Sequence, residues 1–160
     1  MTPTLLDRLQ TRLFVVLVVG GLWTLVVTPF LPVEGGLVLS SGGVTIRDAY
    51  ELTFAALLVV AVFGCLFWEP LYQLSMQFRW EKDWPALFQL LQIVPEAIST
   101  WLLLHVDALN PLSDETGAPT VPGPAFLVLF VSTWIITWLF ANGPMKIFFL
   151  RWRFSGGRLI

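Results

Sequence analysis

The chain has 160 residues, of which 56% are hydrophobic and 12% charged, and its mean hydropathy is +0.78. Soluble domains carry about 25% charged residues, so half that share indicates a protein whose solvent is largely lipid. The net charge of −2 offers no basic surface for nucleic acid. The single cysteine, Cys65, excludes both an intramolecular disulfide and dithiol chemistry.

Four apolar runs dominate the sequence. A hydrocarbon core about 30 Å thick requires roughly 20 apolar residues per spanning helix. The runs cover residues of about 13–32, 52–68, 87–106 and 124–142. We therefore predict an all-α integral membrane protein in which residues 1–160 form one domain with four transmembrane helices. The first run is longer than the core of a signal peptide and lacks a small-residue cleavage site, so we expect it to be retained.

The basic residues predict the topology, because Lys and Arg accumulate on the cytoplasmic side of membrane proteins. Eight of the nine lie before the first helix, in the loop 69–86 or in the tail 143–160. The ninth, Arg47, lies in the loop 33–51, and the loop 107–123 has acids but no base. We predict that both termini and the loop 69–86 are cytoplasmic, and that the loops 33–51 and 107–123 lie outside. Seven Arg against two Lys, with many Gly, Ala and Val, suggest a GC-rich bacterial genome, so we predict a bacterial inner membrane.

Two of the predicted helices have a small residue at every fourth position. Such stripes let helix backbones approach closely in a bilayer. The stripes are Gly20, Thr24 and Thr28 in the first helix, and Thr133, Thr137 and Ala141 in the fourth. We expect these faces to pack within the bundle, with contact to a partner subunit as the alternative.

The first outer loop contains the sequence VEGGLVLSSGGVTIRD. Two short extended runs flank the Ser-Ser-Gly-Gly segment, residues 40–43, which is typical of a hairpin turn. We predict a β-hairpin on the outer surface.

The loop 69–86 begins with Glu69-Pro70, which predicts the end of the second helix, because a residue before proline is disfavoured in helical geometry. Apolar and aromatic residues recur at helical spacing from Leu71 to Trp84. We predict a short amphipathic cytoplasmic helix between the second and third spans.

Charges of both signs crowd together in this loop, opposite a basic C-terminus. The acids among the bases suggest docking between the two segments or onto a partner, although exposed ion pairs contribute only about 0–1 kcal/mol. The candidate docking residues are Arg79, Trp80, Glu81, Lys82, Asp83 and Trp84 in the loop, and Arg151, Trp152 and Arg153 in the tail.

The third helix has a polar stripe and an internal proline. At 100° per residue the stripe covers one arc of about 100°. A carboxylate facing lipid is expensive, so this arc must face protein or water. Pro95 removes a helical hydrogen bond to the carbonyl of Leu91 and predicts a kink. The stripe consists of Gln89, Gln92, Glu96, Ser99 and Thr100.

Three interpretations of the stripe are open. Glu96 could couple protons or cations to transport, or it could be a neutral group hydrogen-bonded to Ser132, Thr133 or Thr137. In the third interpretation the stripe contacts a helix of another protein. We favour the third, because four short helices have little interior in which to bury five polar residues.

The sequence contains no phosphate-binding loop and no hydrolase or metalloprotease motif, so we expect no enzymatic activity, metal or cofactor. We predict a non-catalytic integral subunit of a larger membrane complex for secretion, transport or envelope functions. Its expected partners are membrane lipids and other integral subunits or further copies of itself. The alternative is a small homo-oligomeric transporter or channel in which Glu96 couples protons or cations.

Overall fold

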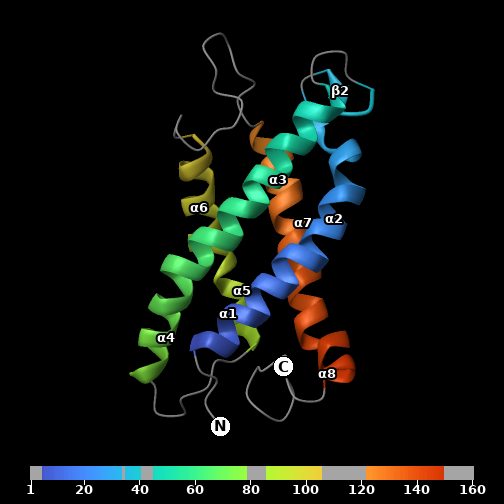
Figure 1. Ribbon diagram of the computed structural model, residues 1–160. Coiled ribbons are helices and arrows are strands. Elements are labelled where there is room, and N and C mark those ends of the chain that lie inside the picture. The colour runs from blue at the N-terminus through green and yellow to red at the C-terminus, as the bar shows by residue number, and fades with distance from the viewer. Residues whose placement is uncertain (1–4, 34, 41–44, 79–85, 106–121, 150–160) are drawn as a thin grey trace.

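The computed structural model describes residues 5–33, 35–40, 45–78, 86–105 and 122–149. It is a helical protein in which three helices are long and apolar enough to cross a membrane, namely Leu5–Phe30, Ile46–Gln77 and Gly123–Phe148. A fourth apolar helix, Gln89–Leu104, is shorter. The helices lie side by side with alternating direction, so that α1, α4, α5 and α8 meet at one end of the bundle (Figure 1).

The first long helix changes its winding three times. It consists of α1 (Leu5–Phe14), the π-helical η1 (Val15–Gly20), α2 (Gly21–Val27) and the 3-10 turn η2 (Thr28–Phe30). The helix begins before the predicted span 13–32, because α1 extends it by two turns toward the N-terminus. Arg8 and Arg12 therefore lie inside this helix and not before it.

A short β-hairpin follows the first helix. Strand β1 (Pro32–Val33) pairs antiparallel with β2 (Gly36–Leu37). The expected hairpin is present, but its turn precedes residues 40–43, where we predicted it. Gly35 has φ of 94° and Gly36 of 137°, a backbone region that glycine enters without the steric cost of a side chain. These two glycines place the turn, and residues 41–44 lie outside the described part of the chain.

The second long helix is continuous through a proline. It comprises α3 (Ile46–Phe63), the π-helical η3 (Gly64–Trp68) and α4 (Glu69–Gln77), and the Thr45 side chain caps its first turn. The prediction of a helix end at Glu69-Pro70 is wrong. In η3 the Glu69 N–H donates to the Gly64 carbonyl five residues earlier. This π-helical turn lies immediately before Pro70, and the helix there accommodates a residue that has no N–H to donate.

Within the described residues, the predicted amphipathic cytoplasmic helix is therefore not a separate element. Residues 71–77 continue the second long helix. Residues 79–85, including the candidate docking residues of this loop, lie outside the described residues.

The third helix is interrupted as the proline predicts. It consists of α5 (Ala86–Leu91) and α6 (Ile93–Leu104), with Gln92 at the junction. Pro95 has no N–H to donate to the carbonyl of Leu91, which is the last residue of α5. The fourth helix, α7 (Gly123–Asn142), matches the predicted span 124–142, and α8 (Pro144–Phe148) follows a bend at Gly143.

Two apolar clusters hold the bundle together. One joins the hairpin to α3 and α7 through residues such as Leu31, Val38 and Leu129. The other joins α3, α6 and α7 through Phe126 and Phe130, whose rings stack with centroids 5.3 Å apart. Both clusters lie toward the end of the bundle that carries the hairpin, and the opposite half contains the polar groups described below.

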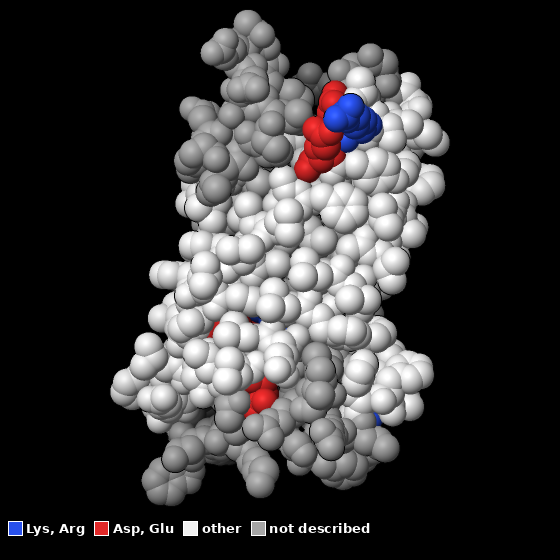
Figure 2. All heavy atoms as spheres, viewed as in Figure 1, with Lys and Arg blue, Asp and Glu red and all other residues white. Residues whose placement is uncertain are grey.

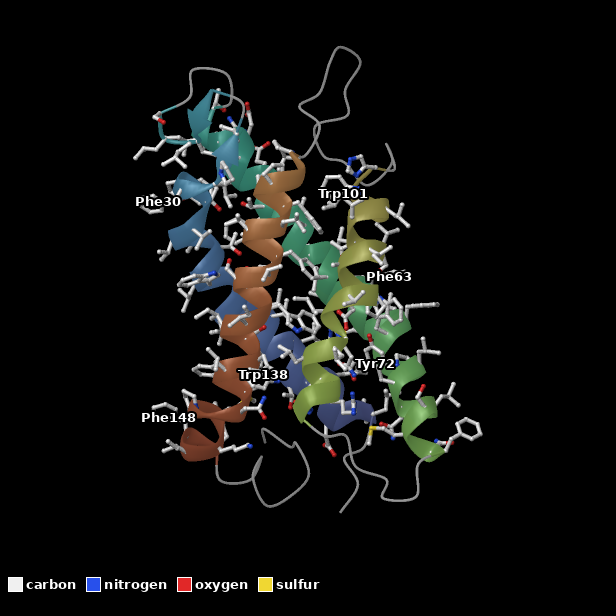
Figure 3. The ribbon with its side chains drawn as sticks, turned by 180° about the vertical axis from the view of Figure 1, so that it is seen from behind. Phe30, Phe63, Tyr72, Trp101, Trp138 and Phe148 are labelled. Carbon is white, nitrogen blue, oxygen red and sulfur yellow. The ribbon has the colours of Figure 1, made fainter. Side chains whose placement is uncertain are left out.

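The outer surface of the helices is apolar. Phe30 and Phe148 project away from the bundle (Figure 3) and are 60% and 74% exposed. On the face shown in Figure 2, charged atoms gather at the upper end and a broad band below them is almost free of charge. Burying these side chains requires lipid or further protein.

Candidate functional site

The centre of the site is a buried ion pair between the first and third helices. Arg12 in α1 donates from Nη1 and Nη2 to the two carboxylate oxygens of Glu96 in α6, with Nη1 3.0 Å from Oε1. The Arg12 side chain is 9% exposed and that of Glu96 is 2% exposed. This bidentate arrangement matches the planar guanidinium to the planar carboxylate.

A second carboxylate extends the pair into a cluster of four charges. Glu69 of α4 accepts from Arg12 Nη1 at 3.2 Å and from Arg8 Nε at 2.7 Å. Arg8 also places Nη1 2.9 Å from the sulfur of Met76. Arg8, Arg12, Glu69 and Glu96 sum to zero net charge, and they come from three of the four helices.

Gly64 makes room for the cluster. A Cβ at this position would overlap the guanidinium of Arg12. Arg12 Nη2 also lies 3.4 Å from the Val60 carbonyl one turn earlier. The guanidinium thus lies directly on the backbone of the second helix, where only a residue without a side chain leaves enough space.

Each of the three helices that supplies a charge is irregular close to that charge. The π-helical η1 begins three residues after Arg12, and η3 ends immediately before Glu69. The interruption at Gln92 precedes Glu96 by four residues. Single π-helical turns are rare in proteins and occur frequently at functional sites.

An outer layer of hydrogen bonds fixes the position of Glu96. Trp68 of η3 donates from Nε1 to the Ser99 hydroxyl at 3.0 Å, and that hydroxyl donates to the Glu96 carbonyl at 3.0 Å. Tyr72 stacks on Trp68 with ring centroids 5.5 Å apart and is buried in the bundle interior (Figure 3). These contacts orient the backbone that carries the carboxylate.

A partly open cavity of about 550 Å³ lies beside the cluster. Arg8, Arg12 and Glu69 form part of its lining, with Lys146 of α8. The rest is contributed by all four helices. Apolar lining residues are Val15, Val16, Ala56, Leu57, Val60, Phe126, Leu129, Phe130 and Ala141, and polar ones are Thr11, Thr24, Thr53, Gln89, Gln92, Thr133, Trp134, Thr137 and Trp138.

Several polar atoms of the lining have no hydrogen-bond partner among the described residues. They are Arg12 Nε, Gln92 Nε2, Thr24 Oγ1, Thr133 Oγ1 and Trp134 Nε1. Thr24 and Gln92 are only 1% and 9% exposed. A buried polar atom that lacks a partner costs about 1–3 kcal/mol, so such atoms are seldom collected in one place without a reason.

The polar stripe of the third helix faces the interior of this chain. Gln92, Glu96 and Thr100 are buried, Pro95 and Ser99 are half-buried, and Gln89 lines the cavity. This placement differs from our expectation that the stripe contacts another protein. The four helices enclose a polar interior that has room for these residues, whereas we expected them to have too little interior space.

The partner of Glu96 also differs from the expected ones. Ser132, Thr133 and Thr137 were candidates, but Ser132 accepts from Trp23 Nε1 at 3.0 Å and Glu96 pairs with Arg12. The reason is helix placement: α6 contacts α3 and α7, while α1 lies close enough for a long arginine to reach between them.

The two small-residue stripes meet each other. A Cβ on Gly20 would lie 3.3 Å from the Thr133 side chain and 3.7 Å from that of Thr137. Thr28 is fully buried and bonds Thr53 at 3.1 Å. Within this chain the stripes therefore bring η1 against α7. The tail residues Arg151, Trp152 and Arg153 lie outside the described residues.

Sequence reasoning missed Arg8, Arg12, Glu69 and Gly64 as parts of the site. We assigned the two arginines to topology alone and placed Glu69 at a boundary. A signal was present: Leu5, Leu9 and Leu13 recur every fourth residue, as do Arg8 and Arg12. This spacing predicts a helix that begins before the apolar run and has both arginines on one face.

The sequence matches no protein-family model, no curated protein and no solved structure. The class that the fold defines is therefore a small helical bundle with several membrane-length helices. The charge cluster and the cavity are the features of this bundle that bear on its function.

Proposed function

We propose that this chain is a small membrane transporter that admits a solute into the cavity of its own helix bundle. The observation that carries the proposal is a charge cluster, drawn from three helices, in the lining of a 550 Å³ cavity. Cavities of about 300–1,000 Å³ suit small organic ligands. Ionisable residues within transmembrane segments pair with one another and mark substrate and ion pathways.

We propose that the protein resides in a bacterial inner membrane with both termini in the cytoplasm. The positive-inside rule supports this orientation, since Arg8, Arg12 and Lys146 all belong to the end of the bundle that carries α1 and α8. The cavity lining then extends from Arg8 and Lys146 at the cytoplasmic end to Phe126 in the first turn of α7, near the outer end. The hairpin and the first turn of α3 lie on the outer side.

In this proposal the cluster couples the solute to the position of the helices. Arg12 bridges Glu69 of the second helix and Glu96 of the third. Protonation of Glu96 removes one of the two negative charges that hold Arg12, and the guanidinium then pairs with Glu69 alone. Because each charge adjoins an irregular turn, an exchange of partners would change the helix contacts around the cavity.

Cysteine labelling from each side of the membrane tests the proposal without a known substrate. In a Cys65→Ala background, Thr133→Cys places a thiol on the cavity lining. A membrane-impermeant maleimide is applied to spheroplasts in one arm and to inverted vesicles in the other. We expect labelling from both sides, because a transporter exposes its cavity alternately to each.

Leu139→Cys is the matched control, since Leu139 lies on the same helix but is half exposed on the outer, apolar surface. A water-soluble reagent should not reach that thiol from either side. Labelling of Thr133→Cys from one side only would show a binding pocket without transport. Absence of labelling from both sides would remove the proposal.

A non-catalytic subunit of a larger membrane complex is the second candidate. It is favoured by the outer surface, because no more than a third of the most apolar stretch of each long helix is buried. Lipid or further helices would cover the remainder. Purification from native membranes in mild detergent discriminates the two: other integral proteins at fixed stoichiometry favour the subunit, and this chain alone favours the transporter.

A further inference from the structure

We propose that the ligand of the cavity is an amphipathic organic anion, with oxygen acceptors at one end and an apolar body. This inference rests on the proposed function in that it takes the cavity to be the site that the solute enters. It goes further by assigning the chemistry of the solute. Three properties of the lining, namely its free donors, its charge and its apolar surface, lead to this assignment.

The unpartnered atoms of the lining are rich in donors. Arg12 Nε, Gln92 Nε2 and Trp134 Nε1 each carry hydrogen and cannot accept a hydrogen bond. The hydroxyls of Thr24 and Thr133 can donate as well. A ligand that satisfies these groups together must present acceptors, which carboxylate, phosphate and sulfonate oxygens do best.

The charges of the lining favour an anion over a cation. Arg8, Arg12 and Lys146 contribute three positive charges and Glu69 one negative charge. Glu96, which is not part of the lining, pairs with both Nη atoms of Arg12. The cluster of four charges is therefore neutral, and Lys146 gives the lining one positive charge in excess. The Nε–H of Arg12 has no hydrogen-bond partner among the described residues.

The cavity lining also includes apolar side chains, two of them with stacked aromatic rings. Phe130 stacks on Trp134 with ring centroids 6.0 Å apart, and both line the cavity together with Val15, Leu57 and Val60. These side chains line the same cavity as the donors and give the body of a ligand an apolar surface to contact. A small inorganic anion would leave this surface uncovered.

Binding of matched naphthalene probes to the purified full-length protein in mild detergent tests the assignment. The probes are 2-naphthoate, 2-naphthol and a 2-naphthylmethyl trimethylammonium salt, each titrated by calorimetry against protein and against detergent alone. We expect saturable binding of naphthoate, at least tenfold tighter than the ammonium probe, with naphthol between them.

Two variants with matched controls locate the binding. Gln92→Leu and Trp134→Phe each remove one free donor from the lining, and each should weaken naphthoate binding about three- to tenfold. Gln73→Leu and Trp23→Phe make the same chemical changes outside the lining and should leave binding unchanged. Loss of binding in the controls alone, or equal loss in all four, would contradict the assignment.

Other outcomes overturn the inference directly. Equal affinities for the three probes would show partition into detergent or a site that does not distinguish charge, and tighter binding of the ammonium probe would show a cation site. Mass spectrometry of lipids displaced by naphthoate separates a membrane lipid from a soluble solute as the natural anion. One-sided labelling of Thr133→Cys together with tight naphthoate binding would remove transport but leave the anion site.

Discussion

The guanidinium of Arg12 occupies the space that the side chain of any residue other than glycine would need at position 64. Gly64→Ala must therefore displace the guanidinium from two carboxylates. Alanine gains about 1 kcal/mol of helix propensity over glycine, but a disrupted buried ion pair costs about 3–5 kcal/mol. We expect a net loss of about 2–4 kcal/mol in the free energy of unfolding, measured in detergent by tryptophan fluorescence.

Gly21→Ala is the control for this prediction, because a Cβ at position 21 would make an ordinary contact of 3.8 Å with Leu57. It should be neutral or slightly stabilising. If both alanine variants behave alike, the close approach of Arg12 to the second helix is not present in the membrane.

The Arg12–Glu96 pair should show strong energetic coupling. Arg12→Gln leaves the carboxylate of Glu96 buried without its cation and should cost about 3–5 kcal/mol of unfolding free energy. The double variant Arg12→Gln with Glu96→Gln removes both charges and should recover at least half of that loss. A double-mutant cycle of unfolding measures the coupling, and strictly additive losses would contradict it.

Glu51→Gln provides the comparison on the exposed surface. Glu51 pairs with Arg47 at 2.8 Å, four residues away on α3. Both side chains are solvated, so removal of this carboxylate should leave the unfolding transition unchanged. A loss comparable to that of Arg12→Gln would mean that burial does not set the strength of these pairs.

Two threonines, the buried Thr28 and the half-buried Thr133, should respond differently to the same substitution. The Thr28 hydroxyl donates to the Thr24 carbonyl at 2.7 Å and contacts the Thr53 hydroxyl at 3.1 Å. Thr28→Val should therefore cost about 1–2 kcal/mol. Thr133→Val removes a hydroxyl without a partner among the described residues and should leave stability unchanged or raise it by up to about 1–3 kcal/mol. Unfolding of both variants under identical conditions checks the difference, and the reverse order would refute it.

A larger side chain in the cavity should abolish ligand entry without unfolding the bundle. Ala141, near the C-terminal end of α7, lines the cavity. Ala141→Leu extends into the cavity, so naphthoate affinity should fall at least tenfold while unfolding shifts by less than about 1 kcal/mol. Labelling of Thr133→Cys in the same background should fall in parallel. Unchanged affinity would place the ligand elsewhere.

Much of the helical architecture follows from local sequence. Apolar runs of membrane length predict the helices, and the fourth span agrees with α7 within one residue. The interruption near Pro95 was predictable because proline lacks the N–H that a helix needs. The continuation of the second helix through Pro70 was not, because it depends on the π-helical turn of η3, whose geometry has no distinctive residue pattern.

The sequence by itself determined that the polar residues of the third helix share one face, because a helical period of 3.6 residues admits no other arrangement. It also determined that this face must avoid lipid. Only the tertiary structure decided what the face meets. Glu96 pairs with an arginine 84 residues away, since the crossing of three helices and the missing side chain at Gly64 bring the two together. Partners so distant in sequence are set by packing, which no local pattern encodes.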